Sequence, residues 1–274
     1  MVLMGWIAPK THELVTPDGR VLQYCLYGPE SGVPVIAQHG TPGGRWERPD
    51  VVAAIEDSGL RMLLVGRPGY GSTRQPGRAV ADIAGDVRLL ADEVGWAEFA
   101  VTGFSGGGPH ALACAALLPD RVNYCSTVAG IASPDLPGFD KSLDWVPDTR
   151  RGEPFLRGQL GQRATEILGD LRTAVPDNGR YERMRDACLE GLDGWIDDDL
   201  ALTQPWGLDL QTITAPVEIW HGSTDDNTTI DHTQWLLANV PTAAARKYDG
   251  DHDPGDAAQR KIFQAIGAGR PLPW

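Results

Sequence analysis

The stretch "EFAVTGFSGGGPHALACAALLPD", residues 98–120, places a glycine-flanked serine between a short apolar segment and a longer one. This order predicts a strand over 98–102 that turns sharply into a helix over about 106–118. Such a turn would explain the glycines at 103 and 107, because backbone segments crowd there and a residue without Cβ avoids a clash. The amide of Gly106, at a helix N-terminus, favours developing negative charge. The stretch therefore makes Ser105 a candidate nucleophile.

The same alternation of short and long apolar segments extends along most of the chain. It predicts βαβ units, and hence an α/β fold with a mostly parallel central sheet flanked by helices. The predicted strands are 33–38, 61–65, 98–102, 122–130, 215–222 and 243–250. The predicted helices are about 44–58, 79–94, 106–118, 230–239 and 254–267. Ahead of them, Pro17-Asp18-Gly19 favours an antiparallel hairpin.

The alternation stops at about Ser133 and resumes after Pro205. The intervening segment is richer in charge, with helical segments near 153–174 and 180–193. We therefore expect a core formed by residues 1–132 and 206–274, with residues 133–205 as an insertion.

Composition narrows the range of partners. The chain has 274 residues and a formal net charge of -13, which argues against nucleic acid and anionic membranes and favours a small-molecule substrate. Its four cysteines, far apart and without a C-x-x-C pair, indicate a reducing compartment and neither zinc nor disulfides. With no secretory h-region and no transmembrane-length apolar run, we expect a cytoplasmic protein; the sequence leaves the oligomeric state open.

Three further loops follow predicted strands: "QHGTPGG" (38–44), "WHGSTDDNT" (220–228) and "DGDHDP" (249–254). Loops at the carboxyl ends of parallel strands share one crevice. A nucleophilic serine needs a base and a carboxylate that orients it, and the order Ser105, then Asp225 or Asp226, then His252 supplies both. The Thr41 amide could complete an oxyanion hole with that of Gly106, although "HGTPGG" is equally typical of a simple turn.

These stretches together resemble the α/β-hydrolase superfamily over nearly the whole chain. "HGTPG" is similar to the family's oxyanion loop, "GRPGYGST" (66–73) to its D-R-P-G-x-G-x-S segment, "GFSGG" to its nucleophile elbow and "HGSTDDNT" to its H-G-x-x-D acid loop. The resemblance implies the following roles: Ser105 as nucleophile, Asp225 as acid, His252 as base, and Thr41 and Gly106 as oxyanion donors. It also implies that residues 133–205 form a helical cap.

Three departures from the family pattern weaken the transfer of any one subfamily's substrate to this chain. Gly66 stands where many relatives have aspartate, Asp251 precedes the base where a small residue is commoner, and two threonines, Thr228 and Thr229, replace the usual Val-Pro. None of these changes removes a candidate catalytic group.

The expected activity is hydrolysis of a carboxylic ester or related acyl bond, without a cofactor or metal. In the superfamily that the sequence resembles, the dehalogenase and epoxide-hydrolase branches have an aspartate at the elbow. A serine at this position therefore disfavours both branches. Alternatives are a proline iminopeptidase, a carbon–carbon bond hydrolase, and a receptor of the same fold with little turnover.

Three adjacent carboxylates, Asp197, Asp198 and Asp199, have no neighbouring histidine or cysteine. We expect them to form the solvated start of a helix rather than a cation site.

Overall fold

The computed structural model describes residues 8–173, 179–188 and 191–269. An eight-stranded sheet forms the centre, in the order β1-β2-β4-β3-β5-β6-β7-β8. The pairs β1–β2 and β2–β4 are antiparallel, and the other neighbouring pairs are parallel. The strands are β1 (Thr11–Val15), β2 (Val21–Tyr27), β3 (Val33–Gln38), β4 (Leu60–Gly66), β5 (Phe99–Phe104), β6 (Val122–Val128), β7 (Val217–Gly222) and β8 (Ala243–Tyr248). The expected α/β fold class is confirmed.

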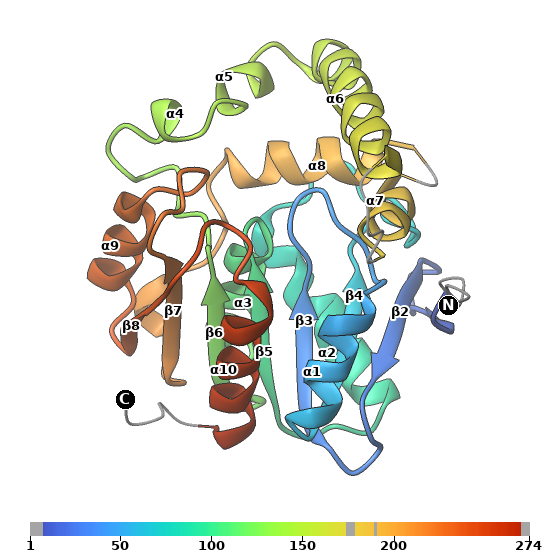
Figure 1. Cartoon of the computed structure of the whole chain (residues 1–274), viewed down its shortest axis with the longest axis vertical. Coiled ribbons are helices and arrows are strands. Elements are labelled where there is room, and N and C mark those ends of the chain that lie inside the picture. The colour runs from blue at the N-terminus through green and yellow to red at the C-terminus, as the bar shows by residue number, and fades with distance from the viewer. Residues whose placement is uncertain (1–7, 174–178, 189–190, 270–274) are drawn as a thin grey trace.

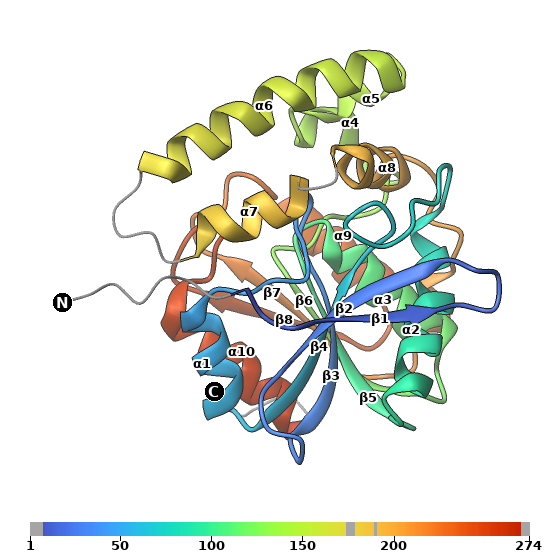
Figure 2. The ribbon, with the colours of Figure 1, turned by 90° about the vertical axis from the view of Figure 1, so that its right-hand side faces the viewer.

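Helices cover both faces of this sheet (Figures 1 and 2). One face carries α1 (Pro49–Asp57) and α10 (Gly255–Ala268). The other carries α2 (Ile83–Glu93), α3 (Gly107–Leu117) and α9 (Ile230–Asn239). Short 3-10 turns lie at Val80–Asp82 and Leu210–Thr212.

Alternation along the central strands divides the core in two. Ile36 and Val101 pack toward α2 and α3, whereas Val35 and Ala100, one residue earlier on the same strands, pack toward α1 and α10. Successive side chains on a strand point to opposite faces, so a strand covered on both sides is apolar throughout. This is why the central strands read as short continuous apolar runs.

The predicted hairpin joins β1 to β2. Its turn closes with a hydrogen bond from the Thr16 amide to the Arg20 carbonyl at 2.8 Å. Gly19 there has φ +84°, a left-handed conformation that glycine adopts without steric cost.

Among the described residues, five α-helices lie between β6 and β7, over the carboxyl ends of the strands (Figure 1). They are α4 (Phe139–Ser142), α5 (Val146–Thr149), α6 (Glu153–Thr173), α7 (Arg180–Cys188) and α8 (Asp193–Leu202). Buried side chains of α6, α7 and α8 pack with Tyr70 into a small apolar cluster of their own. The division into a core and a cap over 133–205 stays a prediction.

Some helix boundaries differ from the expectation. The segment 44–58 becomes helical only at Pro49, a residue that favours a first helical turn. The expected helix over 153–174 is described as far as Thr173, and residue 174 lies outside the described residues. The single helix expected over 180–193 is wrong, because α7 ends at Cys188 and α8 starts at Asp193.

The solvated helix start expected at Asp197, Asp198 and Asp199 is also wrong. These residues are 3%, 0% and 2% exposed, inside α8 rather than at its start. Arginines compensate the first two: Asp197 binds Arg74, and Asp198 binds Arg67 and Arg78. Partners distant in sequence thus neutralise the first two carboxylates, whereas burial and the charge of Asp198 raise the pKa of Asp199.

The cysteines are free thiols, buried at Cys25, Cys114 and Cys125 and half-buried at Cys188. None of the described helices combines the length and apolar character that crossing a membrane takes.

Candidate active site

Ser105 occupies the turn between β5 and α3. Its φ is +51°, in the left-handed region that a residue with a Cβ rarely adopts. The turn is tight: a Cβ on Gly103 would lie 2.2 Å from the Gly107 carbonyl oxygen, and one on Gly107 would lie 2.2 Å from the Gln38 carbonyl oxygen. The two glycines therefore let the backbone approach closely enough to present Ser105 at the carboxyl edge of the sheet.

His252 and Asp225 meet in the loops that follow β8 and β7. The His252 Nδ1 lies 3.0 Å from Asp225 Oδ2 and 3.1 Å from Oδ1. The ring of His252 also packs against Phe104, with centroids 5.1 Å apart. Asp226, the other carboxylate that the spacing allowed, is exposed. The structure thus pairs the base with the carboxylate that the family resemblance selects.

The Asp225 carboxylate is buried and held by its own loop. Its Oδ1 accepts hydrogen bonds from the Asn227 and Thr228 amides, both at 3.0 Å, and its Oδ2 accepts one from the Thr228 hydroxyl at 2.8 Å. Burial acts to raise the pKa of Asp225, but the hydrogen bonds from His252 and Thr228 outweigh it and lower that pKa. Thr228, one of the departures from the family pattern, therefore fixes and ionises the carboxylate.

Ser105, His252 and Thr41 line one cavity of about 200 Å³. The rest of its lining comes from the loop after β6, the connection between α4 and α5, helix α6 and the acid loop. These residues are Ile131, Leu143, Asp144, Trp145, Arg163, Asn227 and Thr228. The cavity is thus closed by residues of both the sheet edge and the helical segment above it.

Thr41 and Gly106, the predicted oxyanion residues, lie against each other. A Cβ on Gly106 would approach the Thr41 Oγ1 to 2.4 Å. In the part of the chain that the structure describes, neither backbone N–H is paired with a hydrogen-bond acceptor. Backbone N–H groups of this kind, close to a candidate nucleophile, are the donors that an oxyanion requires.

Buried charges behind Thr41 were missed by the sequence reasoning. Arg67, from the "GRPGYGST" stretch, donates hydrogen bonds to the His39 carbonyl at 2.6 Å and to the Gly40 carbonyl at 3.2 Å. The Thr41 hydroxyl donates to Asp198 Oδ2 at 2.8 Å. The sequence showed an arginine and an acidic run separately, but gave no signal that they meet.

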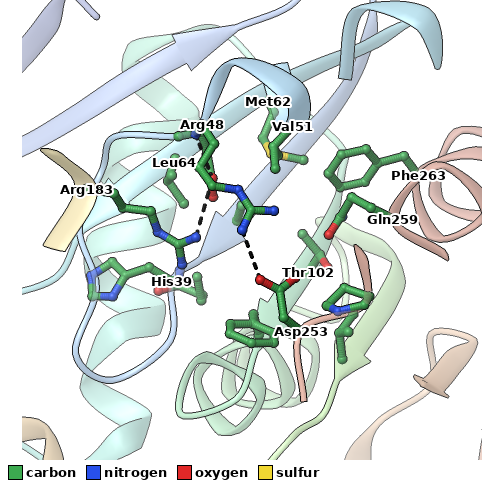
Figure 3. A pocket seen from close by; sticks show the side chains of 16 residues that line it. His39, Arg48, Val51, Met62, Leu64, Thr102, Arg183, Asp253, Gln259 and Phe263 are labelled. Carbon is green, nitrogen blue, oxygen red and sulfur yellow. Dashed lines mark hydrogen bonds and ion pairs between the residues drawn. The ribbon is translucent and has the colours of Figure 1, made fainter. Parts of the chain in front are cut away.

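A second, smaller cavity of about 80 Å³ lies on the α1 and α10 side of the sheet (Figure 3). Met62, Leu64 and Phe263 give it apolar walls, and the Arg48–Asp253 ion pair at 2.9 Å crosses it. Phe104 lines it as well as touching His252. It therefore adjoins the loop of the candidate base, apart from the cavity that holds Ser105.

Among the residues that the structure describes, no three or more histidine, cysteine, aspartate or glutamate side chains are grouped so that they could hold a metal ion.

Comparison with known proteins identifies the family. The family model described as alpha/beta hydrolase fold matches residues 33–246, and the chain belongs to this family. The expected superfamily is therefore confirmed, and the match supports the expectation of an α/β hydrolase.

Two curated relatives match over part of their length. The chain is 27% identical over 165 residues to an uncharacterized hydrolase, YcgS, of Bacillus subtilis (strain 168), covering 60% of this chain and 55% of the relative. It is 28% identical over 137 residues to a non-heme chloroperoxidase of Streptomyces lividans, covering 49% of each. The chain thus matches about half the length of these relatives.

A solved structure matches nearly end to end. The esterase RhEst1 from Rhodococcus sp. ECU1013 superimposes with a TM-score of 0.69 at 20% identity, covering 93% of this chain and 99% of the esterase. At this identity the likeness concerns the fold.

Proposed function

We propose that this protein is a serine hydrolase that cleaves a carboxylic ester or related acyl bond of a small molecule. Ser105 is the nucleophile, His252 the base and Asp225 the acid, without a metal or cofactor. The observation that carries the proposal is the pairing of His252 with Asp225 beside a serine held at φ +51° on the same cavity. The hydrolase and esterase among the similar proteins support the same reaction class.

The first step is removal of the Ser105 proton. A carboxylate accepts hydrogen bonds only, so contact with Asp225 keeps a proton on His252 Nδ1 and leaves Nε2 as the basic atom. Nε2 takes the Ser105 hydroxyl proton while Oγ attacks the acyl carbon, and the Asp225 charge stabilises the imidazolium that forms.

The tetrahedral intermediate places a negative charge on the former carbonyl oxygen. The Thr41 and Gly106 amides donate to that oxygen, and α3 directs its N-terminus toward the same point. His252 then protonates the leaving alcohol. In the second half-reaction it activates a water that releases the acid and restores Ser105.

We assign residues 133–205 the role of a cap that shapes the substrate site. Leu143, Trp145 and Arg163 from this segment line the Ser105 cavity. Ile131, Leu143 and Trp145 give this largely polar cavity an apolar wall, against which a small acyl group can pack. A small-molecule substrate also accords with the net charge of -13, which repels nucleic acid.

The test is steady-state turnover of short-chain nitrophenyl esters. Many product molecules per protein molecule support the proposal. A single stoichiometric burst indicates the receptor alternative, in which the acyl group stays on Ser105. Parallel assays with an N-terminal prolyl amide and a β-diketone distinguish the iminopeptidase and the carbon–carbon bond hydrolase, since each releases a different product.

A further inference from the structure

Asp198 is a completely enclosed charge beside the candidate site, as is its partner Arg67. Asp198 projects from α8, and its side chain has no exposed surface. Its carboxylate contacts Arg67, Arg78 and the Tyr70 hydroxyl, which donates to Oδ2 at 3.1 Å. Burial acts to raise the pKa of Asp198, but the two guanidinium groups outweigh it and hold that pKa well below its ordinary value. A buried carboxylate with this many donors has a fixed position.

The first oxyanion residue is clamped between Asp198 and Arg67. The Thr41 hydroxyl donates to Asp198 Oδ2 at 2.8 Å and accepts from Arg67 Nη2 at 3.1 Å. Arg67 also holds the two preceding carbonyls, of His39 and Gly40. Both the side chain and the backbone leading to Thr41 are therefore fixed by this pair.

His110 lies between Gly106, the second oxyanion residue, and Asp198. Its Nδ1 lies 2.9 Å from the Gly106 carbonyl oxygen, and its Nε2 lies 4.0 Å from Asp198 Oδ1. Burial, aided by the charge of Arg67, lowers the pKa of His110 to about 3, so the ring is neutral and donates from Nδ1 to Gly106. A neutral ring that donates from Nδ1 has only an acceptor at Nε2, so His110 makes no hydrogen bond with the Asp198 carboxylate, and the contact of Asp198 with Thr41 carries the argument.

We infer that Asp198 is a positioning residue for the oxyanion hole, through which the insertion helix α8 fixes the amide of Thr41. The inference rests on the proposed function and extends it, because it makes the segment above the sheet part of the machinery that binds the transition state. The contact joins residues 157 positions apart in the sequence.

The main test is Asp198→Asn, assayed on one ester. If the carboxylate positions Thr41, kcat falls roughly 10²-fold while KM stays within about threefold, because the misplaced amide binds the transition state and not the ground-state ester. The change also removes one negative charge beside the oxyanion. A purely electrostatic role therefore predicts an unchanged or higher kcat, and either result would overturn the inference.

Asp197→Asn is the matched control. Asp197 belongs to the same helix and is equally buried, but it binds Arg74, with 2.9 Å from Nε to Oδ2, and no residue of the oxyanion loop. We expect its kcat to match the wild type. An equal loss in both variants would assign the effect to helix packing and contradict a positioning role.

Variants of Thr41 test the same contact from its other end. They provide the test if Asp198→Asn does not fold. Thr41→Val removes the hydroxyl and should lower kcat at least about tenfold, whereas Thr41→Ser, which keeps the hydroxyl, should lose less. In the double variant Asp198→Asn/Thr41→Val, the two losses should combine to less than their product, because they break one contact. Losses that simply multiply would contradict the inference.

A readout without a substrate separates this inference from the proposed function. The ¹H–¹⁵N resonances of the Thr41 and Gly106 amides should shift in Asp198→Asn and stay in place in Asp197→Asn. Resonances unaffected by Asp198→Asn would overturn the positioning role even in an active enzyme. Shifted resonances in a protein that turns over no ester would instead support the positioning role and count against the esterase.

Discussion

At the scale of single residues, two features define the candidate site: the backbone conformation of Ser105 and the hydrogen bonds to the Asp225 carboxylate. A non-glycine residue at φ +51° costs free energy, which the closely packed glycines around it and the amide hydrogen bond to the Val128 carbonyl at 2.9 Å offset. Asp225 lies in a loop that folds its own donors onto the carboxylate. The turn at Ser105 and the loop at Asp225 are thus each held by contacts of their own.

Ser105→Ala should abolish covalent labelling by a fluorophosphonate probe, because the probe phosphonylates an activated serine hydroxyl. Labelling is followed by in-gel fluorescence, with circular dichroism as the check on folding. Ser126, which is buried in β6, offers a control: Ser126→Ala should label like the wild type. Labelling of Ser105→Ala at the wild-type rate would remove Ser105 from the mechanism.

Asp225→Asn and Asp226→Asn should differ sharply in kcat. The first variant loses the charge that orients His252, and the equivalent change in a serine protease costs about 10⁴. The second alters an exposed side chain and should lose less than about tenfold, a barrier change under roughly 1.4 kcal/mol. Both values are measured on one ester. A crippled Asp226→Asn would move the acid one position along the loop.

At the scale of helices and strands, periodicity explains what could be predicted. The short apolar strands, the hairpin and the turn at Ser105 follow from local patterns, and loop order placed Ser105, Asp225 and His252 at one edge. The burial of carboxylates in α8 could not be predicted, because it depends on contacts such as Arg67–Asp198, whose partners are 131 residues apart. Local sequence carries no signal for such a pair.

Helix α10 offers a test of packing at this scale. Ile262 is buried against the sheet, whereas Gln264 on the same helix is exposed. Ile262→Ala should lower the free energy of unfolding by about 2–5 kcal/mol through lost burial and a cavity. Gln264→Ala should change it by less than about 0.5 kcal/mol. Urea denaturation measures both, and equal effects would argue against this placement of α10.

At the scale of the whole molecule, buried ion pairs such as Arg67–Asp198 and Arg45–Asp186 join the helices above the sheet to the rest of the chain. The chain leaves the sheet toward those helices beside His232 of α9, whose Nδ1 accepts a hydrogen bond from the Ala132 amide at 3.0 Å. Burial lowers the pKa of His232 to about 4. Protonation of Nδ1 would remove the acceptor, so this junction depends on a neutral ring.

The pH dependence of stability should report this junction. An unfolded histidine titrates near ~6.5, so as the pH falls the unfolded chain binds the proton first. His232 therefore contributes a decline in the free energy of unfolding from about pH 6.5 to about pH 4, by up to about 1.4 kcal/mol per pH unit. His232→Asn keeps an acceptor but cannot titrate, and should show a shallower decline in urea denaturation. Identical slopes would exclude the effect.

The burial of Asp198 between Arg67 and Arg78 also limits how this protein can be re-engineered. Exchanging the segment above the sheet for that of a relative is an obvious route to new substrates, since much of the cavity wall lies there. Such a graft would carry the carboxylate away and leave two guanidinium groups enclosed without a counterion, which destabilises a protein strongly. The transferable unit is therefore the segment together with both arginines and Thr41, and a chimera that respects only the sequence boundaries of the insertion would fail at this point.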